Sequence, residues 1–143
     1  MKIAIIGAGN VGASIASLLL SRQMCDNIAL IDINSNLAKA KAIDLSQMAI
    51  ALSQSAKVVG GDDYKLLENF DIVIITAGVA RKDGQSRLEL AKINANIVAD
   101  ASKKIAKFAP NSTIIVVTNP LDIMVYVAYK SSGFNKSKII GMA

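Results

Sequence analysis

Short apolar runs along the chain alternate with longer segments in which apolar residues recur every three or four positions. Six short runs are rich in branched residues, which is typical of strands buried on both faces of a sheet. These predicted strands lie at residues 2–6, 28–31, 57–59, 72–75, 114–117 and 138–140.

The longer segments have the spacing of helices that bury one face. We predict helices over residues 10–22, from Ser35 to about residue 52, over residues 90–108, and from Pro120 to Gly133. Ser35 and Asn119 are suitable N-caps, Pro110 ends the third helix, and Gly133 ends the fourth. Residues 60–63 are expected to form a turn, and residues 77–86 a loop.

Strands that alternate with helices predict an α/β fold with a parallel, doubly wound sheet. We expect a six-stranded Rossmann sheet in the order 3-2-1-4-5-6, built from two halves at residues 1–60 and 71–141. No linker or low-complexity segment interrupts the chain, so residues 1–143 are expected to form one domain.

The composition argues against several classes of function. The 143 residues carry a formal net charge of +5, but the basic residues are scattered and aromatic residues make up 4%, which argues against nucleic-acid binding. No apolar run approaches the roughly 20 residues of a membrane span. The single cysteine, Cys25, suits a cytoplasmic protein and is expected to be buried. There is no histidine, so a proton carrier near neutral pH would have to come from elsewhere.

A glycine-rich segment follows the first strand and opens the first helix, in the pattern G-x-G-x-x-G. Gly7 allows a tight turn, Gly9 lets the backbone approach a pyrophosphate, and Gly12 lets the helix pack closely on the sheet. The helix N-terminus offers N–H groups and partial positive charge to the phosphates. The alternative is a glycine turn in a Rossmann-like domain that binds no nucleotide.

Asp32 ends the second strand, 20 residues after Gly12. Its carboxylate is placed to accept both adenosine ribose hydroxyls and would repel a 2′-phosphate, which favours NAD over NADP. The alternative role is to cap the next helix, but Asn34 and Ser35 are also able to do so.

Two further segments follow the fourth and fifth strands, next to the expected switch point. The loop from Thr76 contains Arg81, Lys82 and Arg87, and paired guanidinium groups can hold a dianionic substrate. A solvated surface loop explains the same composition equally well. Asn119 is able to donate to a substrate oxygen or to the nicotinamide ribose, and a plain helix cap is the competing interpretation.

Taken together, these residues resemble the lactate/malate dehydrogenase family. The matching segments are GAGNVG at 7–12, Asp32, AIDL at 42–45, DIVIITAGVARKDGQSR at 71–87, Asn94, VVTNPLDIMVYVAYKSSGF at 116–134 and IIGMA at 139–143. The resemblance covers essentially the whole chain.

The resemblance implies a role for each matching residue. The residues that would contact NAD are Gly7, Ala8, Gly9, Asn10, Val11, Gly12, Asp32, Thr76, Ala77, Gly78, Asn94, Val117, Thr118 and Asn119. Arg87 would polarise the keto oxygen of the substrate, and Asn119 would also contact the substrate. The resemblance implies no metal.

Arg81 distinguishes two branches of the family. A second substrate carboxylate needs a cation in a closed site, so the resemblance with arginine at this position implies malate and oxaloacetate as substrates. In the lactate-specific members of the family, the same position resembles a glutamine. The implied activity is reversible hydride transfer between malate and NAD, a reaction of the tricarboxylic acid cycle, in a homo-oligomer. Asp83 and Ala40 depart from the usual pattern without removing a ligand group.

The catalytic histidine of the family, its aspartate partner and a C-terminal substrate domain are expected downstream of the sixth strand. We therefore expect the chain to be the NAD-binding domain of a longer enzyme and to be inactive alone. Three alternatives stay open: an L-lactate dehydrogenase, a non-catalytic NAD-sensing Rossmann module, and an NAD-dependent glycosidase, for which a metal-binding cluster is lacking in the sequence.

Overall fold

The computed structural model describes residues 1–80, 84 and 86–143. Within these residues six parallel strands form one sheet in the order β3-β2-β1-β4-β5-β6, as the sequence predicts. The strands are β1 (Lys2–Ile6), β2 (Asn27–Ile31), β3 (Lys57–Gly61), β4 (Ile72–Ile75), β5 (Thr113–Val116) and β6 (Ile139–Gly141). The helices are α1 (Asn10–Ser21), α2 (Ser35–Ala51), α3 (Arg87–Phe108) and α4 (Leu121–Ser132), with short 3-10 turns η1 (Tyr64–Leu67) and η2 (Lys136–Lys138).

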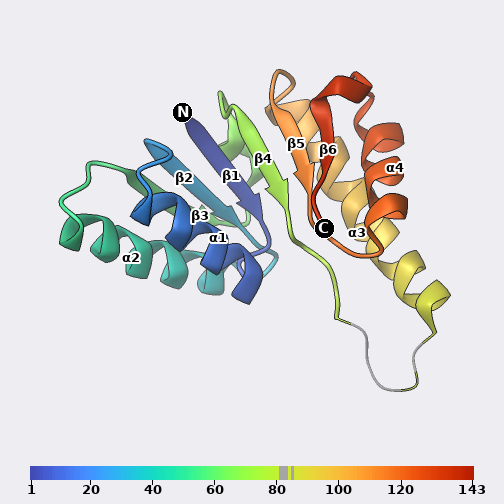
Figure 1. Cartoon of the computed structure of the whole chain (residues 1–143), viewed down its shortest axis with the longest axis horizontal. Helices are drawn as coiled ribbons and strands as arrows, with labels where there is room; N and C mark the ends of the chain where they lie inside the picture. Colours follow the sequence, from blue (N-terminus) through green and yellow to red (C-terminus); the bar gives the residue numbers. More distant parts are fainter. Residues whose placement is uncertain (81–83, 85) are drawn as a thin grey trace.

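Helices cover both faces of the sheet (Figure 1): α1 and α2 pack on one face, and α3 and α4 on the other. Alternate residues of each strand enter opposite cores. In β1, Ile3 and Ile5 pack with α1 and α2, whereas Ala4 and Ile6 pack with α3 and α4. Burial on both sides explains why the strands are almost continuously apolar.

The strand register brings three carboxyl ends to one level. Ile6 of β1 pairs with Ile31 of β2 and with Ile75 of β4. The chain therefore leaves all three strands at the same edge of the sheet. Between β1 and β4 the order of the strands reverses, which is where doubly wound sheets bind ligands.

Strand β3 is longer than predicted, because Gly60 and Gly61 continue it instead of forming a turn. They pair with Leu30 and Ile31 of β2. A Cβ at Gly60 would overlap the Ala38 carbonyl oxygen, so this glycine allows α2 to pack directly on the edge of the sheet. The turn η1 then follows, where Asp63 accepts a hydrogen bond from the Lys65 N–H.

Of the two caps considered for α2 the structure selects Asn34, and the cap predicted for α4 is wrong by one residue. Asn34, not Ser35, caps α2, since its side chain accepts a hydrogen bond from the Leu37 N–H at 3.1 Å. Pro120, not Asn119, is the N-cap of α4, and it makes no side-chain capping bond because it has no polar side chain. Gly133 ends α4 in a left-handed conformation, as predicted.

Other sequence-based expectations concern properties of the whole chain. Cys25 is buried, as expected. In the part of the chain that the structure describes, no helix has the length and apolar character needed to cross a membrane. The same residues contain no group of three or more histidine, cysteine, aspartate or glutamate side chains placed to hold a metal ion.

Candidate nucleotide-binding site

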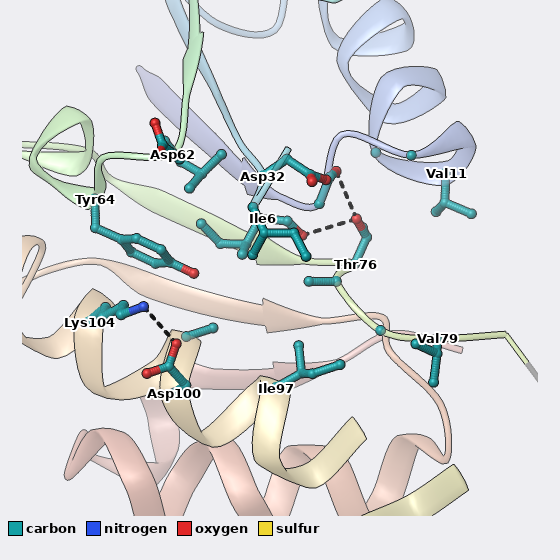
Figure 2. A pocket seen from close by; sticks show the side chains of 18 of the residues that line it. Ile6, Val11, Asp32, Asp62, Tyr64, Thr76, Val79, Ile97, Asp100 and Lys104 are labelled. Atoms are coloured by element: carbon teal, nitrogen blue, oxygen red, sulfur yellow. Dashed lines mark hydrogen bonds and ion pairs between the residues drawn. The ribbon is translucent and has the colours of Figure 1, made fainter. Parts of the chain in front are cut away.

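A cavity of about 790 Å³ opens at the carboxyl ends of β1, β2 and β4. This volume lies in the range of roughly 300–1,000 Å³ that is usual for small-molecule sites. Figure 2 shows its walls, which come from the glycine segment, the ends of β2 and β3, the segment after β4 and one face of α3. Nine of the residues expected to contact NAD line this cavity, namely Gly7, Gly9, Asn10, Val11, Gly12, Asp32, Thr76, Ala77 and Gly78.

Gly7 and Gly12 shape the turn between β1 and α1. Gly7 has a φ of 107°, which disfavours any other residue, and a Cβ there would lie 2.7 Å from Thr76 Oγ1. A Cβ at Gly12 would overlap the Gly7 carbonyl oxygen. These two glycines are therefore needed by the packing of the protein itself.

Gly9 differs from these two glycines. A Cβ at Gly9 would meet no atom within 4 Å, yet Gly9 lines the cavity and has an ordinary φ of −68°. Neither packing nor backbone conformation requires a glycine here. Its absent side chain leaves room for a ligand to approach the backbone.

The N-terminus of α1 points at this open space with its donors free. Within the described residues no side chain caps the helix, and its first turn contains no acidic residue. A helix start with unsatisfied N–H groups and partial positive charge is suited to bind an anion such as a pyrophosphate.

Asp32, which is predicted to bind the adenosine ribose, lines the cavity, and backbone donors fix its side chain. One carboxylate oxygen accepts a hydrogen bond from the Ala8 N–H at 2.7 Å, and the other accepts one from the Asn34 N–H at 2.9 Å. An ionised carboxylate has about four acceptor positions, so two remain for ribose hydroxyls. Asp32 therefore also fixes the glycine segment relative to α2.

The far wall of the cavity was not predicted from the sequence. Tyr64 of η1 faces Asp100 and Lys104 of α3 (Figure 2), and Lys104 Nζ lies 2.7 Å from Asp100 and 5.0 Å from the centre of the Tyr64 ring. Burial raises the pKa of Tyr64 to about 12, and the charges of Asp100 and Asp32 act in the same direction. Tyr64 is therefore neutral at physiological pH.

Apolar residues complete this wall. Ile97 and Ala101 contribute to it from α3, and Ile33, whose side chain is fully exposed, borders the same cavity from the end of β2. An apolar slot next to a carboxylate with free acceptor positions is suited to a flat adenine ring. The helical spacing of residues 97, 101 and 104 is visible in the sequence, but nothing there indicates that this face meets η1.

Several predicted cofactor residues lie behind the cavity wall and hold it together. Asn94 is 2% exposed; its Oδ1 accepts a hydrogen bond from the Val79 N–H at 2.9 Å, and its Nδ2 donates to the Asn119 carbonyl at 2.7 Å. Thr118 Oγ1 donates to the Ala77 carbonyl at 2.8 Å. Both side chains join the segment after β4 to the segment after β5.

Two of the residues expected to bind substrate are exposed and do not line the cavity. Arg87 is the exposed first residue of α3, and Asn119 is exposed before α4. Arg81 lies outside the described residues, as do Lys82 and Asp83. Ala8, Asn94, Val117, Thr118 and Asn119 do not line the cavity, so their contacts with a cofactor stay predictions.

The residues present fit a dinucleotide. The cavity offers an uncapped helix start beside the unobstructed Gly9, a fixed carboxylate one strand away, and an apolar slot beyond it. These features match pyrophosphate, ribose and adenine in the order in which a dinucleotide carries them.

Comparisons with known proteins agree with this geometry. The model of the family described as "lactate/malate dehydrogenase, NAD binding domain" matches residues 1–141. A malate dehydrogenase of Neorickettsia sennetsu is 43% identical over 143 residues, which are 100% of this chain and 45% of that protein.

Solved structures give the same result. The malate dehydrogenase of Archaeoglobus fulgidus in complex with NADH matches with a TM-score of 0.97 and 45% identity, over 100% of this chain and 49% of that chain. The lactate dehydrogenase of Cryptosporidium parvum, complexed with lactic acid and NAD, matches with a TM-score of 0.92 and 36% identity, over 99% of this chain and 44% of that chain. The chain spans about half the length of these relatives. The chain belongs to the family of NAD-binding domains of lactate/malate dehydrogenases.

Proposed function

We propose that the protein carrying this chain is an NAD-dependent malate dehydrogenase, in which the chain binds the dinucleotide. The observation that carries the proposal is the cavity at the switch point, with Gly9, the α1 N-terminus and Asp32 in the order of pyrophosphate and ribose. The relatives named malate dehydrogenase, including the Archaeoglobus fulgidus protein at a TM-score of 0.97, support the choice of reaction.

When bound, the nicotinamide supplies or accepts the hydride. The described residues of this chain bind and orient the dinucleotide. The N-terminus of α1 neutralises the pyrophosphate, and Asp32 holds the adenosine ribose. Asn94 and Thr118 join the segments after β4 and β5 to each other, and the segment after β4 lines the cavity.

Substrate recognition is assigned to two arginines, Arg81 and Arg87, of which Arg87 is the first residue of α3. We propose that Arg87 stabilises the charge that develops on the keto oxygen and that Arg81 pairs with the second carboxylate of oxaloacetate. Both roles come from the resemblance to the family and need the complete protein for a test.

The test is NADH oxidation by the complete protein, followed by absorbance at 340 nm with oxaloacetate or pyruvate as substrate. We expect a preference for oxaloacetate, and Arg81→Gln is expected to lower kcat/KM for oxaloacetate by about 100-fold or more, the effect of losing a desolvated charge pair. Arg22→Gln is the matched control, because Arg22 follows α1 at the end opposite the cavity. A preference for pyruvate in the unaltered protein would contradict the proposal.

L-lactate dehydrogenase is the second candidate, because lactate dehydrogenases match the same fold with a TM-score of 0.92. The same assay separates the two reactions. Equal activity of Arg81→Gln and the unaltered protein on oxaloacetate would favour lactate.

We also propose that the complete protein is a cytoplasmic homo-oligomer. Exposed apolar side chains on α1 and α2, namely Leu18, Ile43 and Ile50, support association through these helices. Light scattering after size-exclusion chromatography tests the association, and a monomeric mass at micromolar concentration would contradict it.

A further inference from the structure

Asp32 and Ile33 line the cavity directly before the first turn of α2. Helix starts attract phosphates, so this turn would be a natural place for the 2′-phosphate of a phosphorylated dinucleotide. Asp32, which lies immediately before the turn, is placed to accept the ribose hydroxyl that carries this phosphate in NADP.

Side chains of the protein already occupy donors of this turn. The Asn34 N–H donates to Asp32 at 2.9 Å, and the Leu37 N–H donates to the Asn34 side chain at 3.1 Å. A phosphate would have to displace these acceptors before it could bind the helix start.

A second carboxylate lies next to Asp32. Gly61 of β3 pairs with Ile31 of β2, so Asp62 and Asp32 leave adjacent strands at the same level. Neighbouring strands are about 4.8 Å apart, and the Asp32 N–H bonds the Gly61 carbonyl at 3.0 Å. Both aspartates line the cavity, and Figure 2 shows that they come from neighbouring segments above Tyr64 and Ile6.

The environment of Asp62 keeps it ionised. The Ser35 hydroxyl beside it lowers the Asp62 pKa most, followed by its own backbone N–H and the charge of Lys39. The buried Ser35 oxygen makes no hydrogen bond of good geometry within the described residues, so its effect comes from proximity. Asp62 therefore adds a second negative charge to the part of the cavity wall that holds Asp32.

We propose that Asp62 is a second specificity residue of the nucleotide site, which excludes the 2′-phosphate of NADP together with Asp32. Neutralising Asp32 alone then leaves one carboxylate in the site, so discrimination against NADP persists in part. The inference rests on the proposed binding of NAD to this cavity and adds the residue that acts beside Asp32.

Fluorescence titration of the complete protein with NADH and NADPH tests the assignment. The variants are Asp62→Asn, Asp32→Asn and the double variant; each keeps the shape of the side chain, and asparagine still offers one acceptor to the Ala8 or Asn34 N–H. Glu68→Gln is the matched control, because Glu68 is exposed, carries the same charge and does not line the cavity.

Asp62→Asn is expected to bind NADPH about three- to tenfold more tightly, as expected for one unit charge acting on a phosphate across several ångströms of partly screened solvent. Its affinity for NADH should stay within about twofold. Adding Asp62→Asn to Asp32→Asn should increase NADPH affinity by a similar factor, whereas Glu68→Gln should not.

The assignment would be overturned, with NAD binding intact, if Asp62→Asn changed the affinity for NADPH no more than Glu68→Gln does. It would also be overturned if Asp62→Asn changed the affinities for NADH and NADPH by the same factor. A lack of NADH binding by the unaltered protein would overturn the proposed function as well. Thermal melting of each variant shows whether it is folded, and Asp62→Ser replaces Asp62→Asn if the latter is not.

Discussion

Alanine substitutions at Gly9 and Gly12 should have opposite effects on stability and binding, although the two glycines lie three residues apart. A methyl group at Gly9 meets no protein atom within 4 Å, and the φ of −68° suits any residue. Alanine is a poorer N-cap than glycine, so we expect Gly9→Ala to lower the free energy of unfolding by less than about 1 kcal/mol. The methyl group would occupy the approach of the pyrophosphate and weaken NADH binding by at least about tenfold, which is roughly 1.4 kcal/mol.

Gly12→Ala places a methyl group on the Gly7 carbonyl oxygen, with Ile5 Cγ2 only 3.1 Å away. The helix start must move from the sheet, which strains the turn and loosens the packing of α1. Overpacking of this kind costs about 1–3 kcal/mol or more, a large part of a total stability of about 5–15 kcal/mol. We therefore expect a clear loss of stability.

Urea unfolding gives the stability of both variants, and NADH titration gives their affinity at a temperature where both are folded. We expect Gly9→Ala to keep its stability and to bind NADH poorly, and we expect Gly12→Ala to lose stability. Unchanged NADH affinity in Gly9→Ala, or equal loss of stability in both variants, would refute the assignment of Gly9 to ligand access.

Three other predictions test the remaining parts of the site. Asn94→Ala removes the side chain that joins the Val79 and Asn119 segments and leaves buried backbone groups without partners, so we expect about 2–4 kcal/mol lower stability by urea unfolding; a loss below 1 kcal/mol would contradict this role. The Tyr64 pKa of about 12 lies above the ordinary 10, so the folded state holds the phenolic proton more tightly than the unfolded state does. The resulting stabilisation of the folded state is present below pH 10 and is lost as the pH rises from 10 to 12. Tyr64→Phe should remove this part of the pH dependence of the urea midpoint, and an unchanged pH profile would argue against it. Ser86→Ala breaks the capping box with Glu89 at the start of α3 and should cost about 1 kcal/mol, whereas an unchanged urea midpoint would mean that the cap contributes nothing.

The sheet could be predicted from the sequence because each strand is buried on both faces. Burial on both sides makes runs such as Ile72–Ile75 almost entirely apolar, and the helices between them set the parallel connections. The end of β3 could not be predicted in this way. Gly60 and Gly61 usually signal a turn, but here the close approach of Ala38 on α2 requires a glycine within the strand.

The part of the cavity wall formed by the glycine segment and Asp32 was predictable from the sequence. The glycine pattern and Asp32 have a fixed spacing whose chemistry is local. The far wall depends on tertiary contact, since Tyr64 meets Asp100 and Lys104 only when η1 packs beside α3. The buried role of Asn94 depends in the same way on two segments far apart along the chain.

We propose above that a nicotinamide dinucleotide lies across the start of α1 with its adenosine ribose on Asp32. A crystal structure of the complete protein with NADH tests this most directly. We expect the pyrophosphate beside Gly9 and both ribose hydroxyls within hydrogen-bond distance of the Asp32 carboxylate. NADH bound elsewhere, or with its adenosine ribose turned away from Asp32, would contradict it.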